Sequence, residues 1–173
     1  MKIIKVKTDS KNYDIKVGHD LLGSTPLEKL VSQKDILLIV DNKVPELLIN
    51  KLKNNLKKSS SKKINSIKIN ASENNKNMSY LAKVYDFLIR NNYSRDCVIF
   101  GVGGGITCDM TGFIASTFLR GVNFVLVPTT LLSQVDASIG GKTGVNHKGF
   151  KNMIGTFNPV SYTHLTLPTT LVV

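Results

Sequence analysis

Two hydrophobic patterns alternate along the chain. Apolar residues dominate segments 35–41, 96–103 and 123–128, which is typical of strands covered on both faces. Between these runs, apolar residues recur every three or four positions and predict helices. The three stripes are Val44, Leu47, Leu48, Leu52 and Leu56, then Met78, Leu81, Tyr85 and Leu88, then Met110, Phe113, Ile114, Thr117 and Phe118. With another strand expected at 61–70, this order predicts an α/β fold with a mainly parallel sheet and flanking helices.

The first 18 residues follow a simpler alternation. KIIKVKT and NYDIKVG read as two short strands, and we expect a hairpin that turns at residues 9–11. In parallel α/β folds, ligands bind beyond the carboxyl ends of the strands. Candidate chemistry is therefore sought after the strands that end near residues 103 and 128.

Composition narrows the class of protein. A length of 173 residues fits one domain, and 42% hydrophobic with 20% charged residues is typical of a soluble chain. The sequence contains no apolar run long enough to cross a bilayer and no signal peptide, so we expect a cytoplasmic protein without a membrane partner. We expect Cys97 and Cys108 to be buried, reduced thiols.

The net charge of +11 raises the question of nucleic-acid binding. The lysines are spread from Lys2 to Lys83 among asparagines and isoleucines, and no basic stripe is interleaved with aromatic residues. This distribution favours a solvated lysine-rich surface, and we expect no nucleic-acid partner.

Four glycines, Gly101, Gly103, Gly104 and Gly105, lie between a predicted strand and a predicted helix. A bare backbone before a helix N-terminus can seat a diphosphate. The usual dinucleotide fingerprint is not matched, because its third glycine would fall at Ile106. On these residues alone, a tight turn without a ligand is an equally open interpretation.

A second glycine-rich stretch, GGKTG, is similar to a Walker phosphate loop. The glycine that such a loop requires further upstream is Asp136 here, and no strand leads directly into the segment, so an ATPase is excluded. We expect a flexible loop that carries Lys142 near Asp136, a cation and a carboxylate that could face a polar ligand.

Taken together, the segments GGG…DMTGF, RG…F…VPTTLLSQVDAS.GGKTGVN and KN.IG.F, in order over residues 103–159, resemble the N-terminal half of the 3-dehydroquinate synthases. The resemblance implies a Rossmann-like NAD-binding domain, here residues 1–160, that is normally followed by a helical metal-binding domain. It also implies conversion of 3-deoxy-D-arabino-heptulosonate 7-phosphate to 3-dehydroquinate and phosphate, a lyase step of the shikimate pathway toward aromatic amino acids and chorismate. NAD acts there as a catalytic cofactor.

The resemblance also assigns residues. Those expected to hold NAD are Asp41, Glu73, Lys76, Gly104, Gly105, Asp109, Thr129, Thr130, Lys142 and Lys151. Carboxylates that accept from ribose hydroxyls favour NAD over NADP. The threonine pair also fits an N-cap for the next helix.

The residues expected at the sugar-phosphate substrate are Arg120, Asp136, Lys142, Lys151 and Asn152, with Asp136, Lys142 and Asn152 assigned to catalysis. The resemblance places Arg120 at the phosphate in a neighbouring subunit, which implies a homodimer of the complete enzyme. A solvated arginine at a helix end is the plainer interpretation.

Several features depart from the family pattern. Lys43 replaces a common asparagine, and HKGFKN differs from the usual H-P-x-G-K-N spacing. Residues 161–173 form an atypical tail without charged residues, in which His164 is expected to be incidental. The family's divalent metal, zinc or cobalt, is held by a glutamate and two histidines of the second domain, so no metal ligands are expected in this chain. We expect a truncated sequence that is inactive alone.

Three other interpretations stay open from the sequence. A related sugar-phosphate cyclase of the 2-deoxy-scyllo-inosose synthase type shares the same motifs. An NAD-dependent polyol dehydrogenase shares a distant version of the fold, although the VPTTLLSQVDAS run argues against it. The third is a stand-alone nucleotide-binding or nucleic-acid-binding module.

Overall fold

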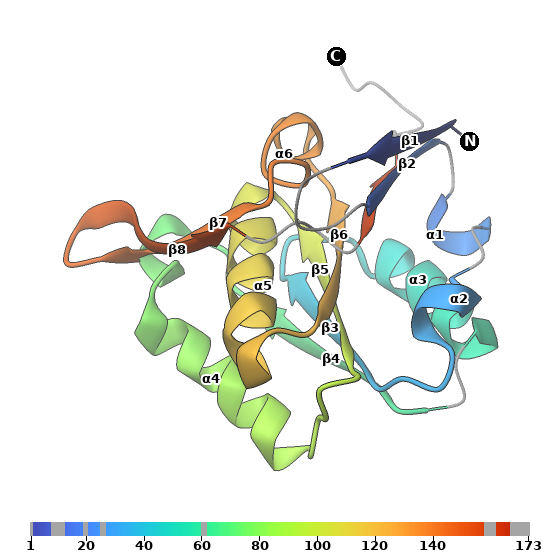
Figure 1. Cartoon of the computed structure of the whole chain (residues 1–173), viewed down its shortest axis with the longest axis horizontal. Coiled ribbons are helices and arrows are strands. Elements are labelled where there is room, and N and C mark those ends of the chain that lie inside the picture. The colour runs from blue at the N-terminus through green and yellow to red at the C-terminus, as the bar shows by residue number, and fades with distance from the viewer. Residues whose placement is uncertain are drawn as a thin grey trace.

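A seven-stranded sheet forms the centre of the molecule, with helices on both faces (Figure 1). The structure is a computed structural model, which describes residues 2–7, 13–18, 21–24, 27–59, 62–157 and 162–166. The strand order is β1-β2-β9-β6-β5-β3-β4. The strands are β1 Lys2–Val6, β2 Tyr13–Gly18, β3 Ile36–Asp41, β4 Ile64–Ile69, β5 Val98–Gly103, β6 Asn123–Pro128 and β9 Tyr162–Thr166.

All strand pairs in this sheet are parallel except β1 with β2. The predicted α/β class with a mainly parallel sheet is confirmed, as is the N-terminal antiparallel hairpin. The turn expected at residues 9–11 lies outside the described residues.

The helices divide between the two faces of the sheet. The helical segments are α1 Leu21–Ser24, α2 Glu28–Val31, α3 Glu46–Ser59, α4 Met78–Arg90, α5 Gly105–Thr117 and α6 Leu131–Val135, with short 3-10 turns η1 Glu73–Asn75 and η2 Phe118–Arg120. Figure 1 shows α4 and α5 on one face and α1, α2 and α3 on the other. Each stripe predicted from the sequence lies in one of the three long helices or at its end.

The central strand β3 explains why both faces are covered. Its six residues are all buried, and successive side chains point to opposite faces. Ile36, Leu38 and Val40 join the hydrophobic cluster under α3. Leu37 and Ile39 join the cluster under α4 and α5. An uninterrupted apolar strand therefore specifies a layer of helices on each side.

The strand β9 lies inside the sheet rather than at its edge. It pairs in parallel with β2, where Ile15 is opposite Thr163, and with β6, where Val125 is opposite Tyr162. Residues 162–166 of the atypical tail thus join the N-terminal hairpin to the rest of the sheet.

A separate antiparallel hairpin, β7 Lys142–His147 with β8 Phe150–Phe157, packs across α5 and projects beyond it (Figure 1). The expectation of a flexible loop at Lys142 is wrong, because this residue begins β7. The hairpin turns at Lys148 and Gly149, with φ of 48° and 82°. Two positive φ values are typical of a tight two-residue turn. A proline at position 148, as in the usual family spacing, could not adopt that φ.

Helix α5 is buried on nearly all sides because it lies between the sheet and this hairpin. At Gly112 the hairpin approaches so closely that a Cβ atom would collide with the Thr143 side chain. None of the helices in the described parts of the chain is long and apolar enough to cross a membrane.

Candidate functional site

The glycine cluster after β5 serves two different purposes. A Cβ on Gly101 would lie 2.5 Å from Oγ1 of Thr111, and one on Gly103 would lie 2.5 Å from Oγ1 of Thr107. Those two glycines let α5 pack closely on β5, as the interpretation of a tight turn without a ligand requires.

Gly104 and Gly105 have no such packing constraint. A Cβ on Gly104 would meet Thr130 at 3.4 Å, and one on Gly105 would meet Ala137 at 3.7 Å, which is ordinary contact. Gly104 is the N-cap of α5, and the helix begins at Gly105. The first backbone N–H groups of a helix have no acceptor within the helix. This turn can therefore receive an anionic group.

Three more predicted cofactor residues surround the glycine turn. Asp41, at the carboxyl end of β3, is 8% exposed, and its Cβ lies 2.9 Å from where a Cβ on Gly103 would be. The backbone N–H of Thr129 donates to the carbonyl of Gly103 at 2.9 Å. Thr130 caps α6 and forms a capping box with Ser133. The N-cap interpretation of Thr130 is thus confirmed.

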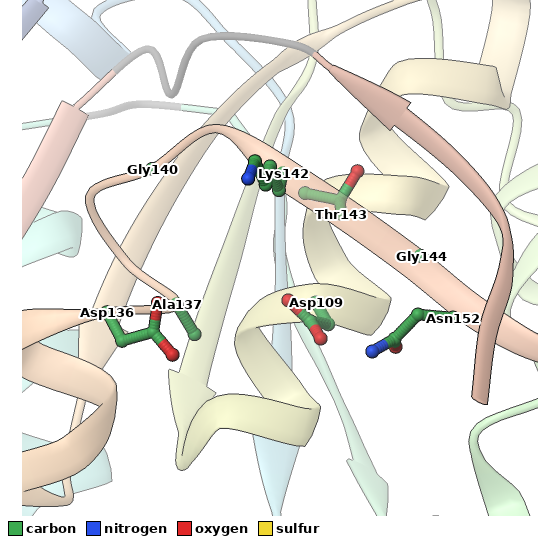
Figure 2. Close-up of a pocket in the computed structure, with 8 residues that line it drawn as sticks. All are labelled: Asp109, Asp136, Ala137, Gly140, Lys142, Thr143, Gly144 and Asn152. Carbon is green, nitrogen blue, oxygen red and sulfur yellow. The ribbon is translucent and has the colours of Figure 1, made fainter.

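A pocket of about 340 Å³ lies next to this turn (Figure 2). Figure 2 shows Asp109 between Asp136 on one side and Asn152 on the other, with Lys142 across the pocket. The residues that line it are Asp109, Asp136, Ala137, Gly140, Lys142, Thr143, Gly144 and Asn152. All three residues assigned to catalysis from the sequence lie in this lining.

Lys76 links two residues of the pocket lining, Asp109 and Asn152, although it is not itself part of that lining. Its side chain is 4% exposed, and Nζ donates to Oδ2 of Asp109 and to Oδ1 of Asn152, both at 2.5 Å. The three residues come from the turn before α4, the first turns of α5, and β8. A buried ammonium group needs such partners, because burial without them is costly.

Opposing influences act on the Asp109 carboxyl. Burial raises its pKa, while the hydrogen bond and the positive charge of Lys76 lower it, and the negative charges of Asp136 and Glu73 raise it further. The net direction is upward. A cation or hydrogen-bond donor entering the pocket would favour the ionised carboxylate.

Asp136 and Lys142 are both exposed at the pocket mouth. Asp136 follows α6 as its C-cap, and Lys142 begins β7. Within the described part of the chain, no ion pair or side-chain hydrogen bond holds either residue. These two side chains are therefore free to contact a ligand.

Two of the predicted residues lie away from the pocket lining. Arg120 is exposed beyond the carboxyl end of α5, the end opposite the glycine turn, and has a φ of 67°. Lys151 is exposed on β8 beside Asn152. The structure does not bring either side chain into the pocket of this chain.

One residue of this region was missed from the sequence. The Asn146 side chain donates to the carbonyl and to Oε1 of Glu73, at 3.1 and 2.9 Å, and accepts from the backbone N–H of Asn152 at 2.9 Å. Asn146 ends the segment GGKTGVN that carries the family resemblance, but the pattern gave this asparagine no role of its own. No group of three or more His, Cys, Asp or Glu side chains that could hold a metal occurs among the described residues.

Comparison with known proteins gives consistent matches to a family profile, a curated relative and two solved structures. The family profile described as 3-dehydroquinate synthase N-terminal matches residues 66–172. The chain is 42% identical over 159 residues to the 3-dehydroquinate synthase of Pelagibacter ubique (strain HTCC1062), covering 89% of this chain and 42% of that protein. The chain thus spans less than half the length of this curated relative.

Two solved structures share the fold. A 2-deoxy-scyllo-inosose synthase, complexed with carbaglucose-6-phosphate, NAD+ and Co2+, superposes with a TM-score of 0.86 at 22% identity, covering 95% of this chain and 44% of that one. The 2-epi-5-epi-valiolone synthase of Streptomyces hygroscopicus subsp. jinggangensis 5008, with NAD+ and Zn2+ bound, gives 0.79 at 30% identity, covering 96% and 45%. Since the matching profile covers most of the chain, including the glycine turn and the whole pocket, the chain belongs to the 3-dehydroquinate synthase family.

Proposed function

We propose that this chain carries the NAD-binding domain of a 3-dehydroquinate synthase, whose sheet includes β9 and so extends beyond residue 160. The observation that carries this proposal is the convergence of Lys76, Asp109 and Asn152 at a pocket beside an open glycine turn, in a chain of this family. The turn supplies backbone donors, and the pocket supplies both charge signs for a polar substrate.

The residues around the glycine turn fit NAD. Gly104 and Gly105 leave the start of α5 open for the diphosphate, and the nearby Asp41 carboxylate can accept from ribose hydroxyls. An anionic Asp41 would repel an additional ribose phosphate, so NAD is favoured over NADP. Thr129 and Thr130 border the same turn and can add hydroxyl and backbone contacts.

The pocket would then hold the reacting end of the sugar phosphate. Lys142 provides positive charge for a carboxylate or phosphate, and Asp136 and Asn152 orient ring hydroxyls. Lys151, which lies on β8 outside the pocket lining, would have to turn toward the substrate to add a second positive charge. Bound NAD supplies a reversible hydride acceptor, and we assign the overall reaction to the phosphate-eliminating lyase of the family. We propose that Arg120, which lies away from its own pocket, reaches the substrate of a neighbouring subunit in a homodimer.

The metal belongs to a part of the enzyme outside this chain in this proposal. The two structural relatives bind Co2+ or Zn2+, so zinc or cobalt is the expected ion for the complete enzyme. We expect no turnover of 3-deoxy-D-arabino-heptulosonate 7-phosphate by the 173-residue chain with either ion added. Measured formation of 3-dehydroquinate would contradict this expectation.

NAD binding is the direct test of the proposal. NAD should raise the melting temperature of the chain, because a ligand that binds only the folded state stabilises it. The variant Lys76→Met should lose this shift, whereas Lys68→Met removes an equal charge from an exposed ion pair and should keep it. Absence of any NAD-dependent shift in a folded wild-type chain would sink the proposal.

The same preparation separates the other interpretations. Binding to DNA or RNA that weakens steeply with salt would favour a nucleic-acid-binding module. A related cyclase is less well supported, since identity to the valiolone synthase is 30% against 42% to the dehydroquinate synthase. Net NADH production from a polyol by the complete enzyme would favour a dehydrogenase.

A further inference from the structure

The Asn146 side chain joins two segments that are far apart in the sequence. One segment is η1 with the turn after it, which carries Glu73 and Lys76. The other is the β7–β8 hairpin, which carries Lys142 and Asn152. Asn146 lies on β7, where the hairpin passes next to the start of α4.

Every polar group of the Asn146 side chain is engaged across this junction. Its amide nitrogen donates to the carbonyl of Glu73 at 3.1 Å and to Oε1 of Glu73 at 2.9 Å. Its amide oxygen accepts from the backbone N–H of Asn152 at 2.9 Å. This side chain both donates and accepts hydrogen bonds, which requires an amide, because a carboxylate could accept but not donate.

The backbone of Asn146 adds a separate link. Its N–H donates to the carbonyl of Lys76 at 2.7 Å. This bond does not depend on the side chain, so a substitution at 146 should leave the hairpin attached to the turn. The side chain instead sets the positions of the Glu73 carboxylate and of the Asn152 backbone.

The Asn152 backbone needs such support. Its φ is 54°, in the left-handed region, which asparagine tolerates but does not favour. Its side chain must also face Lys76, whose Nζ donates to Oδ1 at 2.5 Å. The hydrogen bond from the Asn152 N–H to Oδ1 of Asn146 holds the backbone in this conformation.

We propose that Asn146 is a positioning residue for the cofactor site. Its side chain holds the Glu73 carboxylate and the Asn152 backbone in their positions near Lys76. The inference rests on the proposed NAD site. It predicts that the NAD affinity depends on an amide at 146 although this side chain does not line the pocket. Like charge opposite Glu73 should be worse than no side-chain contact at all.

The experiment measures the NAD dissociation constant by calorimetry for the full chain and its variants. Asn146→Ala should weaken NAD binding by about tenfold, as expected for the loss of one or two hydrogen bonds. Asn146→Asp should weaken it further, because two carboxylates would then face each other. Asn75→Ala is the matched control, since that side chain donates to the carbonyl of Asn70 and not to the hairpin, and it should bind NAD as the wild type does.

A double-mutant cycle separates positioning from general loss of structure. In a Glu73→Gln background the new amide can donate to the carboxylate, so Asn146→Asp should cost only about twofold there. An equal loss in both backgrounds would contradict the proposal, as would unchanged affinity in Asn146→Ala. Failure of the wild-type chain to bind NAD would instead contradict the proposed function, so the two outcomes are distinguishable.

Discussion

Two lysine–carboxylate pairs in this protein have the same chemistry and opposite surroundings. Lys76 and Asp109 meet beside the pocket, with side chains 4% and 22% exposed. Lys68 and Glu46 meet on the surface between β4 and α3, with side chains 57% and 60% exposed. Water screens the second pair, and burial isolates the first. Location in the fold, rather than residue type, therefore decides which of the two lysines contacts residues of the pocket lining.

The largest expected effect comes from removing the buried lysine. Lys76→Met leaves the Asp109 carboxyl without its cation and Asn152 without its donor, and should lower the free energy of unfolding by about 3 kcal/mol. Urea denaturation at pH 7 measures this change. A decrease in the free energy of unfolding no greater than that caused by Lys68→Met would show that burial does not distinguish the two pairs.

Removing both members of the buried pair should cost less than removing one. Lys76→Met with Asp109→Leu leaves no unpaired charge, and the free energy of unfolding should fall by only about 1–2 kcal/mol. The same urea measurement tests this. If the double variant is less stable than Lys76→Met alone, the penalty does not come from the stranded carboxyl.

The pH dependence tests how burial and the lysine balance at Asp109. The pKa of this carboxyl is raised from 3.8, so the folded chain binds the proton more tightly than the unfolded chain does. Its contribution to stability should therefore fall as the pH rises from about 3.8 through the raised pKa. The stability of the wild type minus that of Asp109→Asn, measured from pH 3.5 to 7, isolates this contribution. A difference that grows with pH would show that the charge of Lys76 outweighs burial.

The smallest expected effect is at the surface pair. Glu46→Gln removes a carboxyl whose pKa is lowered by the hydrogen bond and charge of Lys68. A carboxyl whose pKa is lowered in the folded state gives its full stabilisation only above its pKa in the unfolded chain. Any decrease in the melting temperature of Glu46→Gln should therefore appear at neutral pH and vanish in acid. We expect little change in melting temperature at low salt and none at 0.5 M salt, a test that a scanning calorimeter can make. A large decrease in melting temperature that persists at 0.5 M salt would show that the exposed pair stabilises the fold as the buried pair does.

Much of the fold could be predicted because burial leaves a direct pattern in the sequence. The apolar runs became β3, β5 and β6, and the stripes became the faces of α3, α4 and α5. The β7–β8 hairpin was not predicted, because its exposed residues are a mixture that includes Phe150, Met153 and Phe157 beside lysine and asparagine. Such a pattern shows neither a clear alternation nor a helical stripe.

The candidate site was predicted in part. Family motifs identified Asp109, Asp136, Lys142 and Asn152, which the structure brings to one pocket. The roles assigned to them, and to Arg120 and Lys151, stay predictions. Asn146 lies in the quoted segment GGKTGVN, but the sequence could not show its contacts, because Glu73 and Asn152 belong to two other elements.

The sequence by itself determined the layered α/β architecture, since continuous apolar strands must be covered on both faces to exclude water. It also determined the glycine turn, because only residues without a Cβ fit the close packing of α5 on β5. Only the tertiary structure decided that Lys76 meets Asp109 and Asn152, which are 33 and 76 positions away. Parallel strands bring their carboxyl ends to one edge of the sheet, and the long-range pairing of strands and hairpin sets which side chains meet there.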